Sequence, residues 1–139
     1  MRLLAFTDFG LRALMRLAAE PEGRHLSTEA LAAELAISRN HLVKVLQALA
    51  EAGFVRTIRG ARGGVALARP PGEIRFGAVV RRLERDQALV ECFRVDGGRC
   101  NLLPCCRLKG ALAEAREAFL AALDRRSLAD CAIPAPATR

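Results

Sequence analysis

The segment 26–67 constrains the fold of this chain more than any other, because two helical patterns and two strand patterns follow one another within it. The stretch LSTEALAAELA predicts a short helix that ends near Ala36 and has Ser27 or Thr28 as its N-cap. A second helix follows in SRNHLVKVLQALAEAG, with Ser38 as its N-cap. Two helices joined by a turn of three or four residues form a helix-turn-helix candidate.

The second of these helices has two distinct faces. Its apolar positions follow helical spacing and predict a buried face made of Leu42, Val45, Leu46 and Leu49. The N-terminal end and the opposite face carry polar and cationic side chains suited to base edges and phosphates: Ser38, Arg39, Asn40, His41, Lys44 and Gln47. A lone helix with this pattern is more often an ordinary solvated surface, so the residues that follow decide the interpretation.

Two strand-like runs, Phe54 to Ile58 and Val65 to Leu67, flank a turn rich in Arg and Gly. This pattern predicts a β-wing whose tip contacts DNA through Arg59, Arg62 and Gly63. Between positions 38 and 75 the chain has seven Lys and Arg residues against two Glu residues. Helix-turn-helix, wing and local positive charge together favour binding to double-stranded DNA.

Composition and the remaining patterns favour a mainly helical protein. Of the 139 residues 52% are hydrophobic, and only 4% are aromatic. We expect one further helix at each end of the helix-turn-helix and wing unit, at positions 7–19 and 76–85, and a long helix at 108–127. The long helix carries a narrow apolar seam of the kind that pairs helices: Leu108, Leu112, Ala115, Phe119 and Ala122.

These patterns predict a mainly α fold, a winged helix-turn-helix with a two-stranded β-wing and a long C-terminal dimerisation helix. We expect a DNA-binding domain at 1–75, a cysteine loop and dimerisation helix at 76–131, and a disordered tail at 132–139. One recognition helix and one wing read one half-site, so we expect a homodimer on a palindromic operator.

The chain has neither the apolar core of a signal peptide nor a run of about 20 apolar residues that could cross a membrane. We therefore expect a cytoplasmic protein without a membrane partner. In that reducing compartment, clustered thiols bind metal more often than they form disulfides.

Four of the five cysteines lie in CFRVDGGRCNLLPCCRLK, at positions 92, 100, 105 and 106. Zinc is poorly matched because the segment has no C-x-x-C pair and no His. The wide gaps suit an iron-sulfur cluster, in which three thiolates would leave one iron open to a small molecule such as nitric oxide or oxygen. A zinc-stabilised DNA-binding module remains an alternative. A thiol enzyme using Cys105 and Cys106 is disfavoured, because no His accompanies the pair, and we expect no enzymatic activity.

Four stretches, FTDFGLRALMRLA, SRNHLVKVLQALAEAGFV, RGARGGVALARP and PCCRLKGAL, resemble the NsrR-type nitric-oxide-sensing iron-sulfur repressors. These belong to a family of winged-helix regulators that also includes IscR. The resemblance implies a dimer that represses transcription while its [4Fe-4S] or [2Fe-2S] cluster is intact and releases DNA when nitric oxide attacks the cluster. An iron-sulfur supply or redox sensor of the IscR kind is the alternative.

The resemblance also implies a ligand set. Cys92 and Cys100 match the first two ligand cysteines, and Cys106, directly before Arg-Leu, matches the third. The fourth ligand would be Asp8 of the partner subunit, although an Asp in the first turn of a helix also has an ordinary stabilising role. Cys105 and Cys131 lie outside the motif, and we expect His25 to be a solvent-exposed loop residue.

Overall fold

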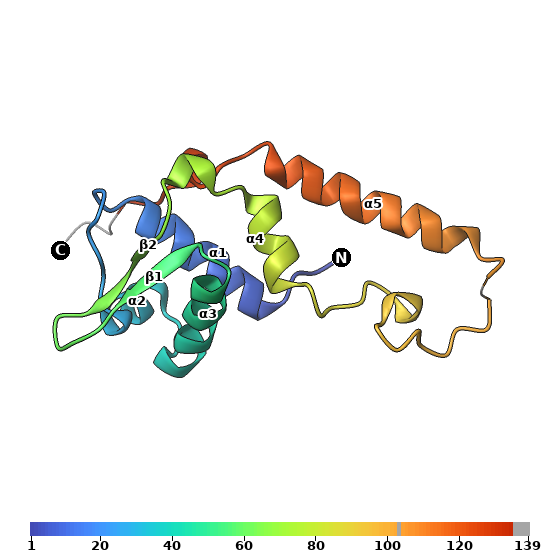
Figure 1. Cartoon of the computed structure of the whole chain (residues 1–139), viewed down its shortest axis with the longest axis horizontal. Coiled ribbons are helices and arrows are strands. Elements are labelled where there is room, and N and C mark those ends of the chain that lie inside the picture. Colours follow the sequence, from blue (N-terminus) through green and yellow to red (C-terminus); the bar gives the residue numbers. More distant parts are fainter. Residues whose placement is uncertain (103, 135–139) are drawn as a thin grey trace.

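The computed structural model describes residues 1–102 and 104–134 of the chain. Its helices and strands follow the predicted order (Figure 1): α1 (Ala5–Ala18), α2 (Thr28–Leu35), α3 (Arg39–Glu51), β1 (Val55–Ile58), β2 (Gly64–Leu67), α4 (Phe76–Leu83) and α5 (Arg107–Asp124). Short 3-10 turns lie between and after them: η1 (Pro71–Glu73), η2 (Glu91–Phe93) and, after α5, η3 (Leu128–Cys131). The predicted mainly α architecture with a two-stranded wing is confirmed. Within the described ranges, no helix is both long and apolar enough to cross a membrane.

The tail that we expected to be disordered begins inside the described part of the chain. The backbone N–H of Ile133 donates to the carbonyl oxygen of Met15 in α1, at 3.0 Å. Positions 135–139 lie outside the described residues.

Local side-chain caps start both helices of the helix-turn-helix. The Ser27 hydroxyl accepts from the Ala30 N–H at 3.1 Å, and the Ser38 hydroxyl accepts from the His41 N–H at 3.2 Å. Helix α2 ends at Leu35 because Ala36 adopts a left-handed conformation with a φ of 54°. This conformation is costly for a residue with a Cβ, and it turns the chain sharply into α3.

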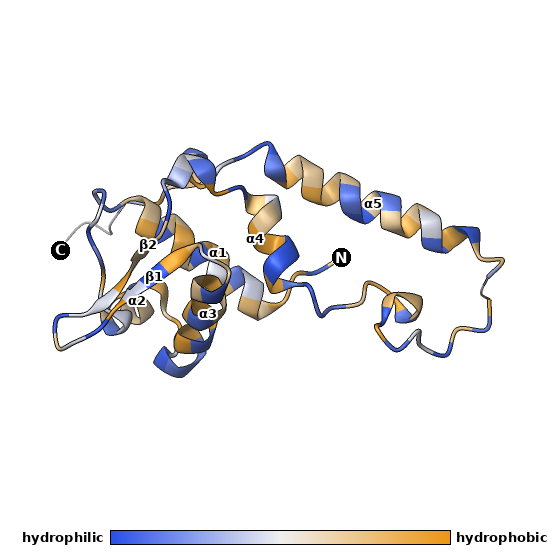
Figure 2. Cartoon of the chain, viewed as in Figure 1, coloured by the Kyte–Doolittle hydropathy of each residue, from blue (hydrophilic) through white to orange (hydrophobic). Residues whose placement is uncertain are grey.

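The core lies where α1 crosses α3 and α4. Its fully buried side chains come from all three helices of the N-terminal half and include Leu14, Leu31, Leu42 and Leu49. Gly10 in α1 permits the close approach of α4, because a Cβ at this position would lie 2.7 Å from Leu83 Cδ1. Figure 2 shows apolar and polar residues alternating along these helices, and the core positions are the apolar ones.

The wing is an antiparallel hairpin that pairs Val55 with Leu67 and Ile58 with Gly64. Its second strand also pairs on its other edge, because Leu26 and Val65 exchange two backbone hydrogen bonds of 3.0 and 2.8 Å. The loop before α2 therefore fixes the base of the wing to the helix-turn-helix.

Helix α5 is attached to the rest of the molecule at its C-terminal end and extends away from it (Figure 1). Gly77 of α4 packs directly against the Leu120 carbonyl and the Asp124 side chain, so no Cβ fits there. Arg81 Nη1 donates to Asp124 Oδ2 at 2.6 Å. The turn after α5 then returns to the core, where Leu128 is fully buried.

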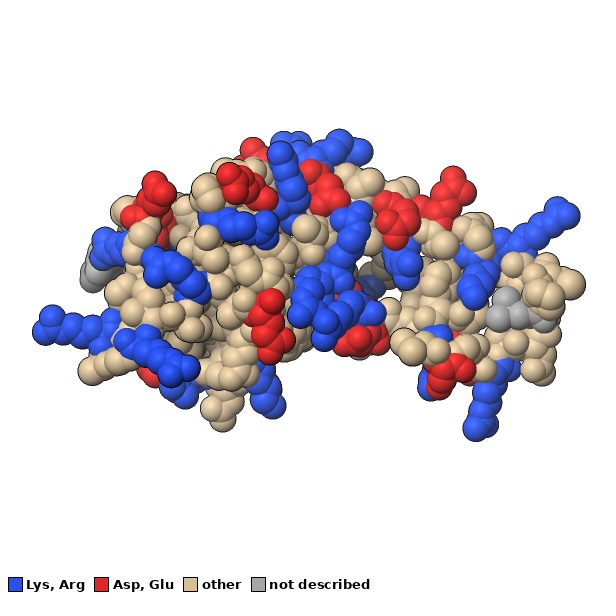
Figure 3. Space-filling model, in the orientation of Figure 1, with Lys and Arg blue, Asp and Glu red and all other residues tan. Residues whose placement is uncertain are grey.

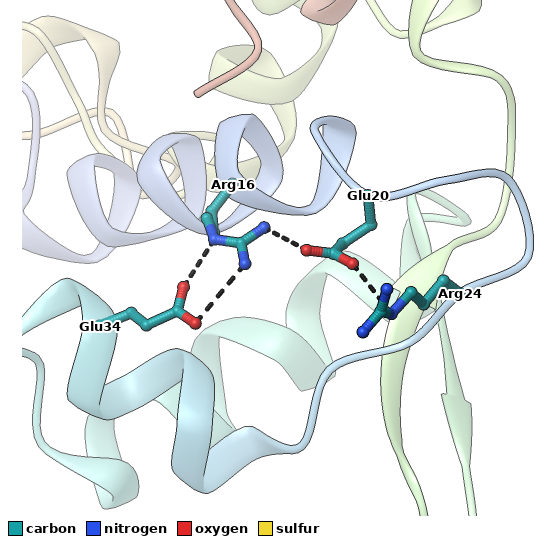
Figure 4. A network of polar contacts seen from close by, with 4 residues as sticks. All are labelled: Arg16, Glu20, Arg24 and Glu34. Carbon is teal, nitrogen blue, oxygen red and sulfur yellow. Dashed lines mark hydrogen bonds and ion pairs between the residues drawn. The ribbon is translucent and has the colours of Figure 1, made fainter. Parts of the chain in front are cut away.

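A buried ionic network joins α1 to α2 (Figure 4). Arg16 is 3% exposed, and its guanidinium donates to Glu34 and to Glu20, with both shortest contacts at 2.6 Å. Glu20 also pairs with Arg24 at 3.3 Å. Burial alone would lower the pKa of Arg16, but the hydrogen bonds that it donates to Glu34 and Glu20 outweigh burial and raise that pKa above its usual value.

Candidate nucleic-acid interface and metal site

The exposed face of α3 holds the residues that the sequence nominated for DNA contacts. Leu42, Val45, Leu46 and Leu49 point into the core as predicted. The side chains on the other side of the helix and at its N-terminal end are exposed: Ser38, Arg39, Asn40, His41, Lys44 and Gln47. One helix thus presents a continuous polar surface, supported from behind by a rigid apolar core.

The wing places its candidate residues in the turn between β1 and β2. Arg59 and Arg62 are exposed, and Gly63 lies against the backbone of Ile58 and Gly60, where a Cβ has no room. Figure 3 shows Lys and Arg side chains projecting from the end of the molecule that carries the wing. Exposed candidate residues thus lie both on α3, the expected recognition helix, and on the turn of the wing, and the loop before α2 pairs with the base of the wing.

His25 lies in the loop before α2 as expected, but it is not fully exposed to solvent. This residue is half-buried, and its Nε2 lies 2.7 Å from the carbonyl oxygen of Arg62 at the tip of the wing. The contact joins residues 37 positions apart, so no local pattern indicates it. His25 holds the arginine-bearing turn against the loop that precedes α2.

Asp8 lies at the surface of α1 and connects to the recognition helix through three contacts. Its carboxylate pairs with Arg12 at 3.0 Å, and the Arg12 guanidinium lies over the Phe9 ring at 5.2 Å from the centroid. The Phe9 ring stacks with the imidazole of His41 in α3, with centroids 6.4 Å apart. Arg12 also donates to the Leu35 carbonyl at the end of α2, at 3.4 Å. The spacing of Asp8 and Arg12 indicates their pairing in sequence, but the stack on His41 is visible only in three dimensions.

The cysteines differ in their surroundings, and all five are free thiols. Cys92 lies in η2, Cys100 lies in the following loop, and Cys106 is the N-cap residue of α5; all three are half-buried. Cys105 and Cys131 are exposed, and Cys131 lies in η3 beyond the other end of α5. Burial thus separates the three cysteines that match the ligand motif from the two that do not.

The loop that carries these thiols is folded back on itself. Glu91 accepts a hydrogen bond from the Arg99 N–H at 2.9 Å, so the residues next to Cys92 and Cys100 meet. Gly98, with a φ of 60°, packs against Glu91 where a Cβ would clash. The Phe93 ring lies under two cations of α5, with Lys109 at 5.9 Å and Arg116 at 5.2 Å. The segment around Cys92 is therefore docked on the helix that Cys106 begins.

The donor set fits an iron-sulfur cluster better than zinc. Three half-buried thiols in one loop are soft ligands, and both histidines of the chain lie in the DNA-binding half. Across residues 1–102 and 104–134, no three His, Cys, Asp or Glu side chains are gathered closely enough to hold a metal ion. Ligation by these three thiols would therefore require them to come closer together than they lie here.

Comparison with known proteins identifies the family to which this chain is similar. Residues 3–133 match the Rrf2 family model, described as an iron-dependent transcriptional regulator. The chain is 46% identical over 130 residues to the HTH-type transcriptional regulator NsrR of Geobacillus kaustophilus. The aligned region covers 94% of this chain and 88% of that protein.

Solved structures agree with this placement. A structure of T. potens IscR matches with a TM-score of 0.72 and 25% identity, over 94% of this chain and 85% of that one. CymR, the global cysteine regulator of B. subtilis, matches with a TM-score of 0.73 and 26% identity, over 95% of this chain and 96% of that one. These relatives are regulators, which excludes the thiol-enzyme alternative. The chain belongs to the Rrf2 family of transcriptional regulators.

Proposed function

We propose that this regulator is a homodimeric repressor that binds a palindromic operator and senses nitric oxide through an iron-sulfur cluster. Cys92, Cys100 and Cys106 would hold the cluster, with Asp8 of the partner subunit as the fourth ligand. The 46% identity to a protein named NsrR supports this function, and so does the half-burial of the three motif cysteines. When bound, the cluster would supply an iron without a thiolate, open to nitric oxide.

The surface of α5 supports the dimer. Within this helix, every residue of which the structure describes, only Leu120 is buried. Leu108 is 62% exposed, although it begins the apolar seam. Figure 2 shows apolar residues recurring along the helix on the part that extends from the core. Pairing of this seam with the same seam of a second copy would remove it from water.

The DNA-binding role falls to α3 and the wing. In α3 the proposed contacts are Ser38, Arg39, Asn40, His41, Lys44 and Gln47, and in the wing they are Arg59, Arg62 and Gly63. Amide and cationic side chains on a helix read base edges in the major groove, while arginines on a wing suit phosphates or a narrow minor groove. The two DNA-binding units of a symmetric dimer match the two half-sites of a palindromic operator.

The observation that carries the sensing proposal is the line of contacts from Asp8 to His41. Arg12 binds Asp8, lies over Phe9 and reaches the carbonyl of Leu35. If the Asp8 carboxylate bound the cluster of the partner subunit instead, the Arg12 guanidinium would keep only its contacts with the Phe9 ring and the Leu35 carbonyl. The Phe9 ring stacks on His41, so a change at Asp8 reaches the recognition helix through side chains already in contact.

An anaerobic visible absorption spectrum, recorded before and after stoichiometric nitric oxide, tests the proposal when operator binding is followed in parallel. A suitable duplex can be enriched from a random pool with the anaerobically reconstituted protein. We expect a brown chromophore that bleaches as the duplex is released. A protein that stays colourless after reconstitution with iron and sulfide, yet binds DNA, would contradict the cluster and favour a zinc or structural role.

The similarity to T. potens IscR favours one alternative, a sensor of iron-sulfur supply or redox state. Oxygen and nitric oxide separate the two functions. Release of DNA at stoichiometric nitric oxide but not at equal oxygen supports the nitric oxide sensor, and the reverse order supports the alternative.

Paired cysteine substitutions test the ligand set. Cys106→Ala should abolish cluster binding, whereas Cys105→Ala, one residue away and exposed, should retain it. Asp8→Ala should retain a cluster that is lost faster under air. Equal retention of the cluster by both cysteine variants would contradict the assignment of Cys106.

A further inference from the structure

Two residues near the DNA-binding surface form an ion pair across the helix-turn-helix. The Arg39 Nε donates to Glu29 Oε1 at 2.7 Å. Arg39 is the first residue of α3, and Glu29 lies in the first turn of α2. The pair therefore joins the N-terminal ends of the two helices.

Neither side chain is buried: Arg39 is 58% exposed and Glu29 is 65% exposed. An exposed pair of this kind adds little to stability, and a carboxylate in the first turn of α2 interacts favourably with the helix dipole whether or not Arg39 is present. The ion pair itself therefore has little structural effect. The hydrogen bond from Arg39, and then the backbone N–H of Glu29 itself, lower the pKa of the Glu29 carboxyl below its usual value. Glu29 is thus a fixed negative charge beside the helix that would enter the major groove.

A fixed negative charge at this edge acts against phosphate contacts. It repels the DNA backbone, and it also occupies the guanidinium of Arg39, which would otherwise pair with any phosphate within reach. Phosphate contacts carry no sequence information, whereas an arginine directed at a guanine edge does. A carboxylate that restrains the arginine therefore weakens binding to random DNA more than binding to the operator.

We propose that Glu29 is a specificity-determining residue, which restrains Arg39 and so suppresses binding to non-operator DNA. The inference rests on the proposed DNA-binding function but not on the cluster. It names a residue of α2 that lies outside the recognition helix and the wing.

The test compares Glu29→Gln with the unaltered protein on two duplexes: one enriched from a random pool with the unaltered protein, and the same bases in scrambled order. Both proteins are reconstituted anaerobically, and the comparison is repeated without the cluster. We expect the scrambled duplex to bind about fivefold more tightly to Glu29→Gln, as for relief of one repulsion and gain of one phosphate contact. The salt dependence of that binding should steepen by about one unit of log–log slope. Operator affinity should change less than twofold, because the relief of repulsion and the gain in phosphate contact offset the loss of a directed arginine.

Two controls make the result specific to the pair. Glu114→Gln removes the same charge from an exposed position of α5 and should leave the preference for the operator unchanged. In an Arg39→Gln background, the added Glu29→Gln change should alter the preference no further.

Equal changes on both duplexes, no change on either, or an undiminished effect in the Arg39→Gln background would each overturn the proposal. If the unaltered protein itself bound both duplexes equally, sequence-specific DNA binding would have failed instead. The two failures are therefore distinguishable.

Discussion

Replacing Arg16 with Met is expected to lower the free energy of unfolding by about 3 kcal/mol, at the low end of the cost of breaking a buried ion pair. Met keeps much of the buried stem but removes the guanidinium from between Glu20 and Glu34. The cost stays near the low end because the side chain of Glu34 is 26% exposed and can regain water, and because Glu20 keeps its pairing with Arg24. For a chain of 139 residues the entropy of unfolding is roughly 0.3 kcal/mol/K, so the midpoint of thermal unfolding should fall by about 10 °C.

Circular dichroism during thermal and urea unfolding measures this effect, and the chain supplies a matched control. Arg24→Met makes the same change at the outer end of the network, where the side chain is 68% exposed, and should cost less than about 0.5 kcal/mol. Adding Glu34→Gln to Arg16→Met should recover part of the loss, since it removes an unpaired carboxylate. A shift under about 3 °C for Arg16→Met, or equal shifts for both arginines, would refute the idea that this network stabilises the packing of α1 on α2.

Three further outcomes are expected. Lys44→Ala should weaken operator binding and reduce its salt slope by about one, as loss of one phosphate contact does, without changing the visible spectrum; an unchanged slope would remove Lys44 from the interface. Ala36→Gly should raise the unfolding midpoint by roughly 3 °C, because glycine adopts the left-handed conformation without the cost of about 1 kcal/mol that a Cβ incurs; a lower midpoint would contradict the conformation at Ala36. The Ser127 N–H and hydroxyl lower the pKa of Asp130 below its ordinary 3.8, so this carboxylate stabilises the fold above that pH and the benefit is lost as the pH falls below it. The difference in thermal midpoint between the unaltered protein and Asp130→Asn should therefore shrink between pH 6 and pH 3, and a difference independent of pH would exclude this role.

Local patterns predicted those parts of the structure that nearby residues determine. The apolar spacing in α3 identified its buried face, and Ser27 and Ser38 are the N-caps that their positions indicated. The strands of the wing lie within one residue of their predicted ends, because an Arg- and Gly-rich turn between two β-forming runs has few other solutions. The end of α2 was predicted within one residue, but the left-handed conformation of Ala36, which usually belongs to glycine, was not.

Contacts between distant residues were not predictable from the sequence. Arg16 is buried beside Glu34, which lies 18 residues away on another helix, and no local pattern indicates this contact. The stack of Phe9 on His41 and the contact of His25 with the wing depend in the same way on how whole helices pack. For the metal site, the spacing of Cys92, Cys100 and Cys106 nominated the ligands. Their half-burial, and the docking of Phe93 on α5, became visible only in the structure.

The attachment of α5 at one end gives this helix the mechanics of a lever. Its pivot is the corner where Gly77 of α4 meets Leu120 and Asp124, and its far end begins at Cys106. With 18 residues the helix is about 27 Å long, so a tilt of about 5° at the pivot moves the far end by roughly 2 Å. Conversely, a displacement of about 2 Å at the cysteine loop corresponds to a rotation of α5 by only about 5° where it meets Gly77. Because the glycine at the pivot brings α4 into direct contact with α5, such a rotation would pass to α4 with little side-chain adjustment.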